Sequence, residues 1–202
     1  MCEEIAPWRP VLEKALRRNR EVNHSKYIQL ATVTAQGYPA NRTVVFRGFL
    51  ENTNYLQMVT DKRSQKYEDL KINPMAEICW YFTKTREQFR IRGVVRIVEE
   101  LGDDSNVGQE EIRPYLEARR KAWENLSDNG KEQFFWPTPG KERKKKWDWG
   151  DWKAEATATP ANFCLLLLQP LLVDHLQLRG NPQNRYIYTL KGGKWEWQEV
   201  NP

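Results

Sequence analysis

The stretch Gln88-Phe89-Arg90-Ile91-Arg92-Gly93-Val94-Val95-Arg96-Ile97-Val98-Glu99 has the most regular pattern in the chain. Its odd-numbered positions from 89 to 97 hold apolar residues and one glycine, whereas three of its even-numbered positions hold arginine. Successive side chains of a β-strand point to opposite faces, so a period of two indicates a strand. We therefore predict a long strand with one apolar face and one partly basic face.

Other short, β-rich segments lie on both sides of this strand and are separated by turn residues. The further strands that we predict are 27–34, 41–50, 55–60, 76–83, 162–178 with an interruption at Pro170, 185–190 and 195–200. The predicted helices are 8–20, 64–71 and 110–126, and residues 131–160 have no sustained period and are predicted to be an ordered loop. About seven antiparallel strands with inserted helices favour a mainly β fold that closes into a barrel or split barrel, because closure removes exposed edges.

The length of 202 residues fits a single domain over 1–202, with an N-terminal helical segment at 1–24 and a helical, tryptophan-rich insertion at 101–161. A hydrophobic fraction of 40% and a net charge of +5 are not typical of a disordered chain. The longest apolar run, at 163–168, is far shorter than the roughly 20 residues that span a bilayer. We expect no membrane association and a cytoplasmic location.

The cysteines and histidines do not form a recognisable metal-binding motif. Cys2, Cys79 and Cys164 are far apart in the sequence, and only His24 and His175 accompany them. Structural zinc sites need closely spaced pairs of such ligands. We therefore predict reduced thiols, with no disulfide framework and no metal site.

The first candidate for a binding site is Arg42-Thr43-Val44-Val45-Phe46-Arg47, a predicted strand with an arginine at each end. The period of two sends Arg42 and Arg47 to opposite faces unless a bulge at Gly48 intervenes. Two solvated arginines on an edge strand are the alternative interpretation.

The second candidate is Thr60-Asp61-Lys62-Arg63-Ser64-Gln65-Lys66, where a strand leads directly into a helix. The first turn of a helix has unpaired amides and the positive end of the helix dipole, so hydroxyls and a lysine there could bind a phosphate. Ordinary capping by Asp61 or Ser64 would explain the same residues. A third candidate is Gln88, which begins the strand at 88–99. A single glutamine at the start of a strand does not by itself indicate a binding site.

Taken together, these three motifs resemble the FMN-binding pattern of the pyridoxamine 5′-phosphate oxidase family. Their order and approximate spacing match, and Asn73-Pro74 and Arg185-Tyr186 lie where the family has an Asn-Pro and an Arg-Phe pair. The resemblance covers roughly 25–100 and 162–202, and 101–161 correspond only loosely, as in a divergent branch.

The resemblance implies an FMN-binding split β-barrel that forms a homodimer with FMN at the subunit interface. The cofactor-binding residues that it implies are Arg42, Thr43, Val44, Val45, Phe46, Arg47, Val59, Thr60, Ser64, Gln65, Lys66, Gln88, Leu176 and Arg185. In this scheme Arg42, Ser64, Gln65 and Lys66 surround the phosphate, and Gln88 comes from the partner subunit. The sequence departs from the family pattern at Arg47, Gln65, Val59 and Leu176, where the family has lysine, arginine, an aromatic residue and tryptophan.

The substrate-binding residues are less well matched. The family's Arg-x-His before the final arginine is absent, because the segment here reads Gly180-Asn181-Pro182-Gln183-Asn184-Arg185. The family's Tyr-x-x-x-Arg-x-x-x-Ser helix is represented by Tyr115 and Arg119, with Trp123 in place of the serine. With Arg47, these two residues are the predicted contacts to a small phosphorylated substrate. A surface pair on a charged helix is the alternative.

The function that this resemblance implies is oxidation of pyridoxamine or pyridoxine 5′-phosphate to pyridoxal 5′-phosphate, by hydride transfer to the flavin and then to oxygen. The missing Arg-x-His leaves open an FMN-binding protein with another substrate or with reductase activity. A nucleic-acid-binding module is a less favoured alternative, drawn from the basic run at 141–146 beside several tryptophans. The tryptophan cluster itself, formed by Trp123, Trp136, Trp147, Trp149 and Trp152, is predicted to serve packing rather than chemistry.

Overall fold

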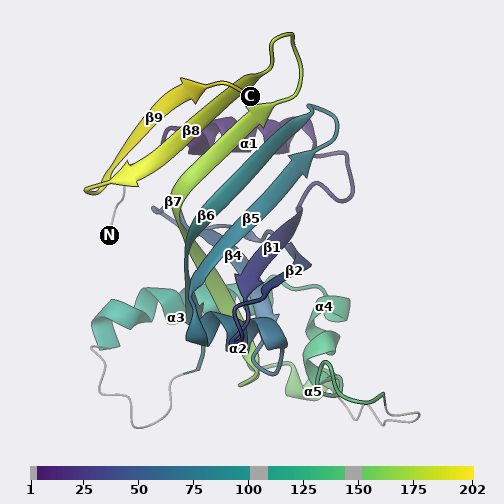
Figure 1. Ribbon diagram of the computed structural model, residues 1–202. Coiled ribbons are helices and arrows are strands. Elements are labelled where there is room, and N and C mark those ends of the chain that lie inside the picture. Colours follow the sequence, from purple (N-terminus) through teal and green to yellow (C-terminus); the bar gives the residue numbers. More distant parts are fainter. Residues whose placement is uncertain (1–3, 101–108, 144–151) are drawn as a thin grey trace.

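The computed structural model describes residues 4–100, 109–143 and 152–202, which form a mainly β fold (Figure 1). Within these residues, nine antiparallel strands make one curled sheet in the order β2-β1-β5-β6-β7-β4-β3, and β8 and β9 extend it from β7. The strands are β1 (Tyr27–Val33), β2 (Pro39–Val45), β3 (Gly48–Phe49), β4 (Leu56–Asp61), β5 (Met75–Phe82), β6 (Glu87–Val98), β7 (Phe163–Gln177), β8 (Asn184–Lys191) and β9 (Lys194–Val200). The helices are α1 (Trp8–Arg18), α2 (Gln65–Ile72), α3 (Gln109–Glu124), α4 (Asp128–Glu132), the 3-10 turn η1 (Gln133–Phe135) and α5 (Trp152–Glu155).

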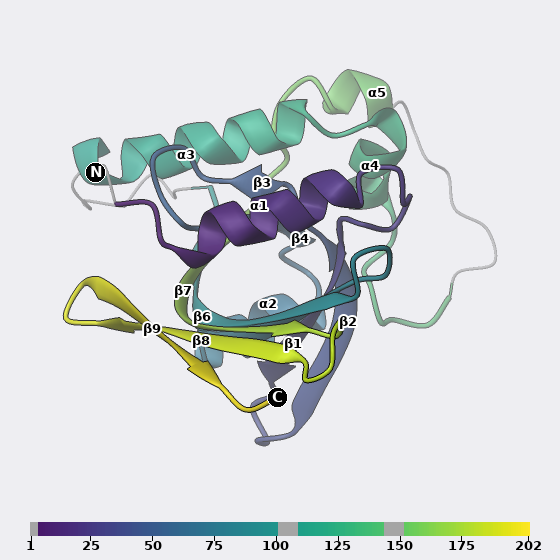
Figure 2. The same cartoon turned by 90° about the horizontal axis from the view of Figure 1, so that it is seen from above.

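The main core lies between the sheet and α1. In Figure 2 the sheet curves beneath α1, so that the helix covers the concave side. Trp8 and Leu12 of α1 are fully buried there against Trp80 of β5 and Phe89 and Ile91 of β6. The alternation predicted for 88–99 is confirmed, because the odd-numbered residues supply this core and the arginines face away from it.

The segment predicted as one strand over 41–50 is in fact two strands, so that prediction was wrong. β2 ends at Val45 and β3 begins at Gly48, whose φ of +120° is open to glycine but strained for other residues. At this break the amide of Arg47 donates to the carbonyl of Gln57 on β4 over 2.8 Å, which brings the two ends of the sheet together. The result is the split barrel expected from the sequence.

The predicted interruption at Pro170 is also wrong, since β7 continues through it. The irregularity appears instead as a bulge: Gly93 pairs with Pro170 and Arg92 pairs with Leu172, which leaves Leu171 as the extra residue. A Cβ at Gly93 would lie 2.0 Å from the carbonyl oxygen of Gln169. Only glycine therefore allows the two strands to approach so closely at this point.

A second layer packs on the other side of β4 and β7. There Trp123 of α3 is 2% exposed and makes edge-to-face contacts with Phe134 of η1 and Phe163 of β7. The loop predicted for 131–160 thus contains short helical segments, and Trp123 serves packing as predicted. Trp147 and Trp149 lie outside the described residues. None of the helices in the described part of the chain is both long and apolar enough to cross a membrane.

Candidate functional site

Three of the predicted cofactor-binding residues lie together where β4 leads into α2. Thr60 Oγ1 and Ser64 Oγ are 3.0 Å apart, and the ammonium of Lys66 donates to both, over 3.1 and 3.3 Å. Ser64 occupies the N-cap position of α2 without making a side-chain capping bond. Its hydroxyl donates to the carbonyl of Asp61 over 2.7 Å instead. The structure therefore brings the hydroxyls and the lysine into one cluster beside the first turn of α2.

Arg42 reaches the same cluster from β2. Its guanidinium donates to Thr32 Oγ1 over 2.6 Å and forms an ion pair of 3.2 Å with Asp69 of α2. Gln65 donates to the other carboxylate oxygen of Asp69 over 3.1 Å. Asp69 is 1% exposed, and its buried carboxylate binds both Arg42 and Gln65 and so positions them near Lys66.

The electrostatics of this cluster suit an anion. Burial, and next the nearby positive charge of Arg42, lower the pKa of Lys66. Two cations thus share the cluster with the buried carboxylate of Asp69, while the nearby Asp61 is already paired with Arg63. A phosphate dianion would offset the repulsion between the two cations through charge-assisted hydrogen bonds. The unpaired amides and the dipole of the α2 N-terminus add to the attraction. The residues present therefore fit the phosphate group of a cofactor such as FMN.

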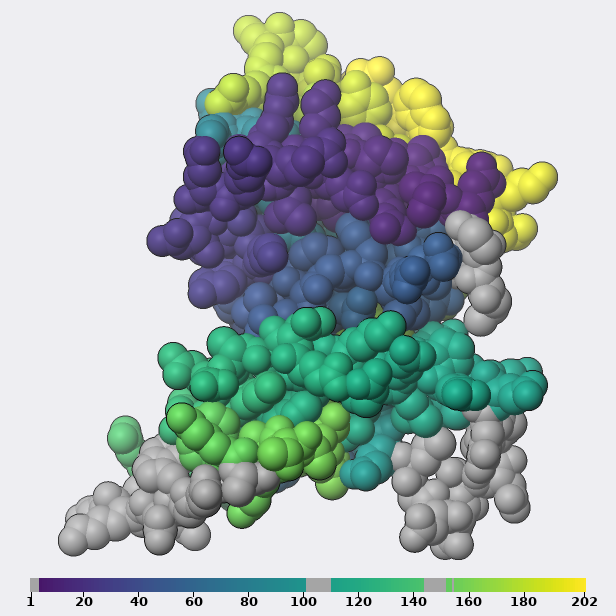
Figure 3. Space-filling model, turned by 180° about the vertical axis from the view of Figure 1, so that it is seen from behind, coloured from purple at the N-terminus to yellow at the C-terminus, as the bar shows by residue number. Residues whose placement is uncertain are grey.

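A groove of about 630 Å³ lies between the β2–β3 break and α3. In Figure 3, α3 runs across the molecule below the segment that contains β3 and β4. Val45, Phe46 and Arg47 line one side of the groove, and Tyr115 lines the other. Burial lowers the pKa of Arg47, and among the described residues no carboxylate forms an ion pair with it. Arg47 is therefore available to an anionic ligand in the groove.

The remaining predicted ring contacts on these strands face different surroundings. Val44 is buried in the main core, whereas Thr43 is exposed on the opposite face of β2. Val59 is half-buried and packs against the hydrophobic clusters beneath α3. Backbone atoms of β2 could still line a ring, but neither Val44 nor Val59 is among the residues that line the groove.

Gln88, Leu176 and Arg185 lie on the convex face of the sheet, away from this cluster. Arg185 forms two hydrogen bonds with the carboxylate of Asp174, of 3.0 and 2.8 Å. Leu176 pairs with both Gln88 and Arg185 in the sheet, so the three residues form a row across β6, β7 and β8. Three strand spacings, or about 14 Å along the sheet, separate β2 from β6. One chain therefore does not bring these three residues to its own phosphate cluster.

The two predicted substrate residues on α3 point in different directions. Tyr115 lies in the groove, with the guanidinium of Arg96 4.8 Å from the centre of its ring. Arg119 is 7% exposed and donates to the carbonyl oxygens of Phe163 and Pro160, over 3.0 and 2.9 Å. The structure thus brings Tyr115 together with Arg47 but directs Arg119 to the backbone before β7.

Three residues of the site were missed in the sequence. Asp69 and Thr32 hold Arg42, and Asp174 holds Arg185. The spacing of four residues between Gln65 and Asp69 on a helix was a usable signal, because such residues lie on one face. Thr32 and Asp174 gave no signal, since their roles arise from contacts across the sheet.

Comparison with known proteins gives consistent matches. The family model described as "Pyridoxamine 5′-phosphate oxidase, FMN-binding domain" matches residues 5–99. An Arabidopsis thaliana protein named pyridoxine/pyridoxamine 5′-phosphate oxidase 2 is 40% identical over 207 residues, which cover 100% of both chains. A pyridoxine/pyridoxamine 5′-phosphate oxidase of Cyanothece sp. is 26% identical and covers 90% of this chain and 81% of its own length.

Solved structures agree with these matches. A pyridoxamine 5′-phosphate oxidase-related, FMN-binding protein from Nostoc punctiforme superposes with a TM-score of 0.85 at 45% identity, covering 98% of this chain and 99% of that one. PhzG from Burkholderia lata, solved with tetrahydrophenazine-1-carboxylic acid, has a TM-score of 0.71 at 17% identity over 100% of both chains. At this identity the second match supports the fold alone.

Proposed function

Because the chain belongs to the pyridoxamine 5′-phosphate oxidase family of FMN-binding proteins, we propose that it uses FMN to oxidise pyridoxamine or pyridoxine 5′-phosphate to pyridoxal 5′-phosphate. The observation that carries this proposal is the cluster in which Arg42 and Lys66 lie beside the N-terminus of α2. Such a concentration of positive charge, held by the buried Asp69, is suited to the phosphate of the cofactor.

In this proposal each side chain has a positioning role. Arg42, Ser64, Gln65 and Lys66 hold the FMN phosphate, and the β2 backbone from Thr43 onward lies along the ring. The chemistry that bound FMN would supply is hydride acceptance from the C4′ carbon of the substrate and transfer of the electrons to oxygen; the products would be an aldehyde and hydrogen peroxide, with ammonia released by hydrolysis when the substrate is the amine. The protein holds the substrate over the ring, and no side chain needs to act as a strong base.

The groove between the β2–β3 break and α3 is the proposed substrate site. Arg47, without an ion-pair partner among the described residues, would bind the substrate phosphate, and Tyr115 would donate a hydrogen bond to it. Arg119 would contribute directly only after releasing the carbonyls of Phe163 and Pro160. In its present position it instead stabilises the backbone beneath α3.

We propose that the working unit is a homodimer with one FMN in each of two interfacial sites. The support is the separation of Gln88, Leu176 and Arg185 from the phosphate cluster of the same chain. A second copy facing the convex side of the sheet would bring its own three residues to the cluster. A cytoplasmic location belongs to the same proposal and is consistent with the free thiols of Cys79 and Cys164.

One observation favours a second candidate, an FMN-dependent enzyme of this family with a different substrate. The segment Gly180-Asn181-Pro182-Gln183-Asn184, which precedes Arg185, has neither the arginine nor the histidine of the family's Arg-x-His. The groove would then bind an anionic substrate through Arg47, without the contacts that the family's arginine and histidine make to pyridoxal phosphate.

Two measurements on the purified protein test these proposals. An absorption band near 450 nm, with FMN identified by mass after heating, is expected, and colourless protein that binds oligonucleotides in a salt-sensitive manner would favour the nucleic-acid alternative. Incubation of the FMN-loaded protein with pyridoxamine 5′-phosphate should give aldehyde and peroxide in equal amounts. Bound FMN without any product would reject the first substrate assignment and support the second candidate.

A further inference from the structure

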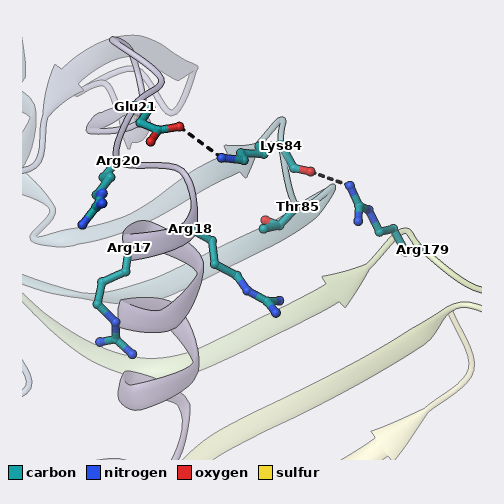
Figure 4. Close-up of a pocket in the computed structure, with 7 residues that line it drawn as sticks. All are labelled: Arg17, Arg18, Arg20, Glu21, Lys84, Thr85 and Arg179. Atoms are coloured by element: carbon teal, nitrogen blue, oxygen red, sulfur yellow. Dashed lines mark hydrogen bonds and ion pairs between the residues drawn. The ribbon is translucent and has the colours of Figure 1, made fainter.

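A basic hollow of about 420 Å³ lies at the C-terminal end of α1, far from the FMN cluster. Five cations line it: Arg17, Arg18, Arg20, Lys84 and Arg179. They come from α1 and the residues that follow it, the β5–β6 turn, and the β7–β8 turn, as Figure 4 shows. β5 begins beside α2 and ends at this turn, so about 25 Å of strand separates the two sites.

The positive charge in the hollow is only partly neutralised by the described residues, because five cations face Glu21 and, nearby, Glu87. Glu21 is the one carboxylate among its lining residues, and it forms an ion pair of 3.3 Å with Lys84. In the described part of the chain, Arg17, Arg18 and Arg20 form no ion pair. A smaller hollow of about 230 Å³ shares Arg18 and Arg179 and adds Lys14 and Glu87. Glu87 is already hydrogen-bonded to His175, over 2.9 Å.

The elements that carry these cations are held in place. Asn19 is 1% exposed, donates to Ala15 of α1 and to Thr85 Oγ1, and accepts the amide of Lys84 over 3.0 Å. Arg179 donates to the carbonyl of Lys84 over 2.6 Å, which fixes the β7–β8 turn against the β5–β6 turn. In Figure 4, Arg18 extends from α1 toward these turns and Arg179 approaches them from the other side.

Helix stabilisation accounts for only part of this arrangement. Arg17 and Arg18 lie in the last turn of α1, where cations interact favourably with the helix dipole. Lys84 and Arg179 belong to other elements, so stabilisation of α1 does not explain why they line the same hollow. Together with Arg18 they line one hollow, so three separate segments of the chain bring cations to the same space. Guanidinium groups are well suited to binding phosphate oxygens.

We propose that this basic hollow is a second anion site, which binds a small ligand bearing one or more phosphate groups. Its volume lies in the range of small-molecule sites. Among the described residues that line it there is no aromatic side chain, so the ligand is recognised by its charge rather than by ring stacking. The site lies on the α1 side of the sheet, because Glu87 faces α1 while Gln88 faces the convex side, and it stays open in the proposed dimer.

Calorimetric titration of the FMN-loaded protein with inorganic pyrophosphate at low salt tests this site. We expect a dissociation constant below about 1 mM. Arg18→Gln and Arg179→Gln should each weaken binding about tenfold, because each removes a charge-assisted contact. Arg113→Gln, which removes an exposed arginine of α3, is the matched control and should leave the affinity unchanged.

Three results would overturn the proposal. The first is unchanged affinity in both Arg18→Gln and Arg179→Gln, and the second is loss of binding in Arg47→Gln, which would place the pyrophosphate in the substrate groove. The third is binding of oligonucleotides with no measurable pyrophosphate affinity. Flavin absorbance and melting temperature, recorded for every variant, show that the fold and the FMN site are intact. Arg179 is exposed, so its variant alone decides the result if Arg18→Gln does not fold.

Discussion

Lys66 is the residue on which FMN binding should depend most clearly. Lys66→Gln removes one of two cations from the phosphate cluster, and we expect FMN to bind about ten- to a hundredfold more weakly. Lys71→Gln, an exposed lysine on the same helix, is the control. Fluorescence quenching of added FMN measures both affinities. Equal affinity in wild type and Lys66→Gln would remove Lys66 from the site.

The lowered pKa of Lys66 also predicts a pH dependence. Burial and the charge of Arg42 lower this pKa, so Lys66 in the free protein loses its proton at a lower pH than an ordinary lysine. FMN affinity should therefore fall as the pH rises through that lowered value, because the phosphate prefers the protonated lysine. In Lys66→Gln this alkaline decrease should disappear. An identical decrease in the variant would assign the effect to another group.

Glu87 links stability to pH at a second position. Its burial would by itself raise the pKa, but hydrogen bonds from His175 and Thr85 outweigh burial and lower it. A lowered pKa means that the folded state gains stability above the unfolded-state pKa and loses it as pH falls through the folded-state value. Glu87→Gln should cost about 1 kcal/mol at pH 7, and the difference should shrink below about pH 4.

Urea unfolding at several pH values measures the effect of Glu87→Gln. Glu196→Gln is the control, because the Lys191–Glu196 pair is exposed and such pairs contribute little. A constant difference between wild type and Glu87→Gln from pH 7 to pH 3 would contradict the linkage.

At the level of the elements, the bulge in the pairing of β6 with β7 is the feature on which the next prediction depends. Gly93→Ala would place a Cβ 2.0 Å from the carbonyl oxygen of Gln169, and backbone cannot yield as a side chain can. We expect a loss of about 3 kcal/mol in the free energy of unfolding, measured by urea denaturation. Gly130→Ala in α4 is the control, because its Cβ would make only ordinary contacts of 3.4 Å or more. A Gly93→Ala variant as stable as wild type would show that the strands can separate at the bulge.

The elements also show how far sequence reasoning reaches. The alternation at 88–99 and the helical spacing at 8–20 depend on local periodicity, and the structure confirms both as β6 and α1. The break at Arg47–Gly48 and the continuity of β7 through Pro170 depend on pairing with β4 and β6, which no local pattern contains. The 3-10 turn η1 was missed for the same reason, since Arg63 and Asn162 hold it through the carbonyl of Phe134.

For the whole molecule, the motifs indicated which residues of the candidate site lie together mainly where those residues are close in the sequence. The motif at 60–66 placed Ser64 and Lys66 correctly together because a helix start fixes neighbours in space. Arg42 joins them only through the curl of the sheet and the buried Asp69. Tyr115 and Arg119 share one face by spacing, yet the contacts of α3 with β7 direct Arg119 away from the groove. Helical spacing alone therefore does not tell which residue of a shared face lines the groove and which one packs against the sheet.

The quaternary structure is the last property that the fold allows us to predict. The convex face exposes Tyr27 by 50% and Tyr81 by 42%, beside the row that contains Gln88. Exposed aromatic residues on a sheet face are typical of protein interfaces. A double variant with Tyr27→Asp and Tyr81→Asp should place charges in the interface and raise the dimer dissociation constant at least about a hundredfold.

Sedimentation velocity and flavin absorbance together test this prediction. If FMN needs Gln88, Leu176 and Arg185 of a second chain, the double variant should be monomeric and should also lose FMN, although Arg42 and Lys66 are untouched. Tyr38→Asp is the control, because Tyr38 is another exposed tyrosine (69%) but lies in the β1–β2 turn. This variant should remain dimeric and keep its FMN. A monomeric variant that keeps FMN at wild-type affinity would show that one chain completes the site, because the convex-face residues would then be unnecessary for binding.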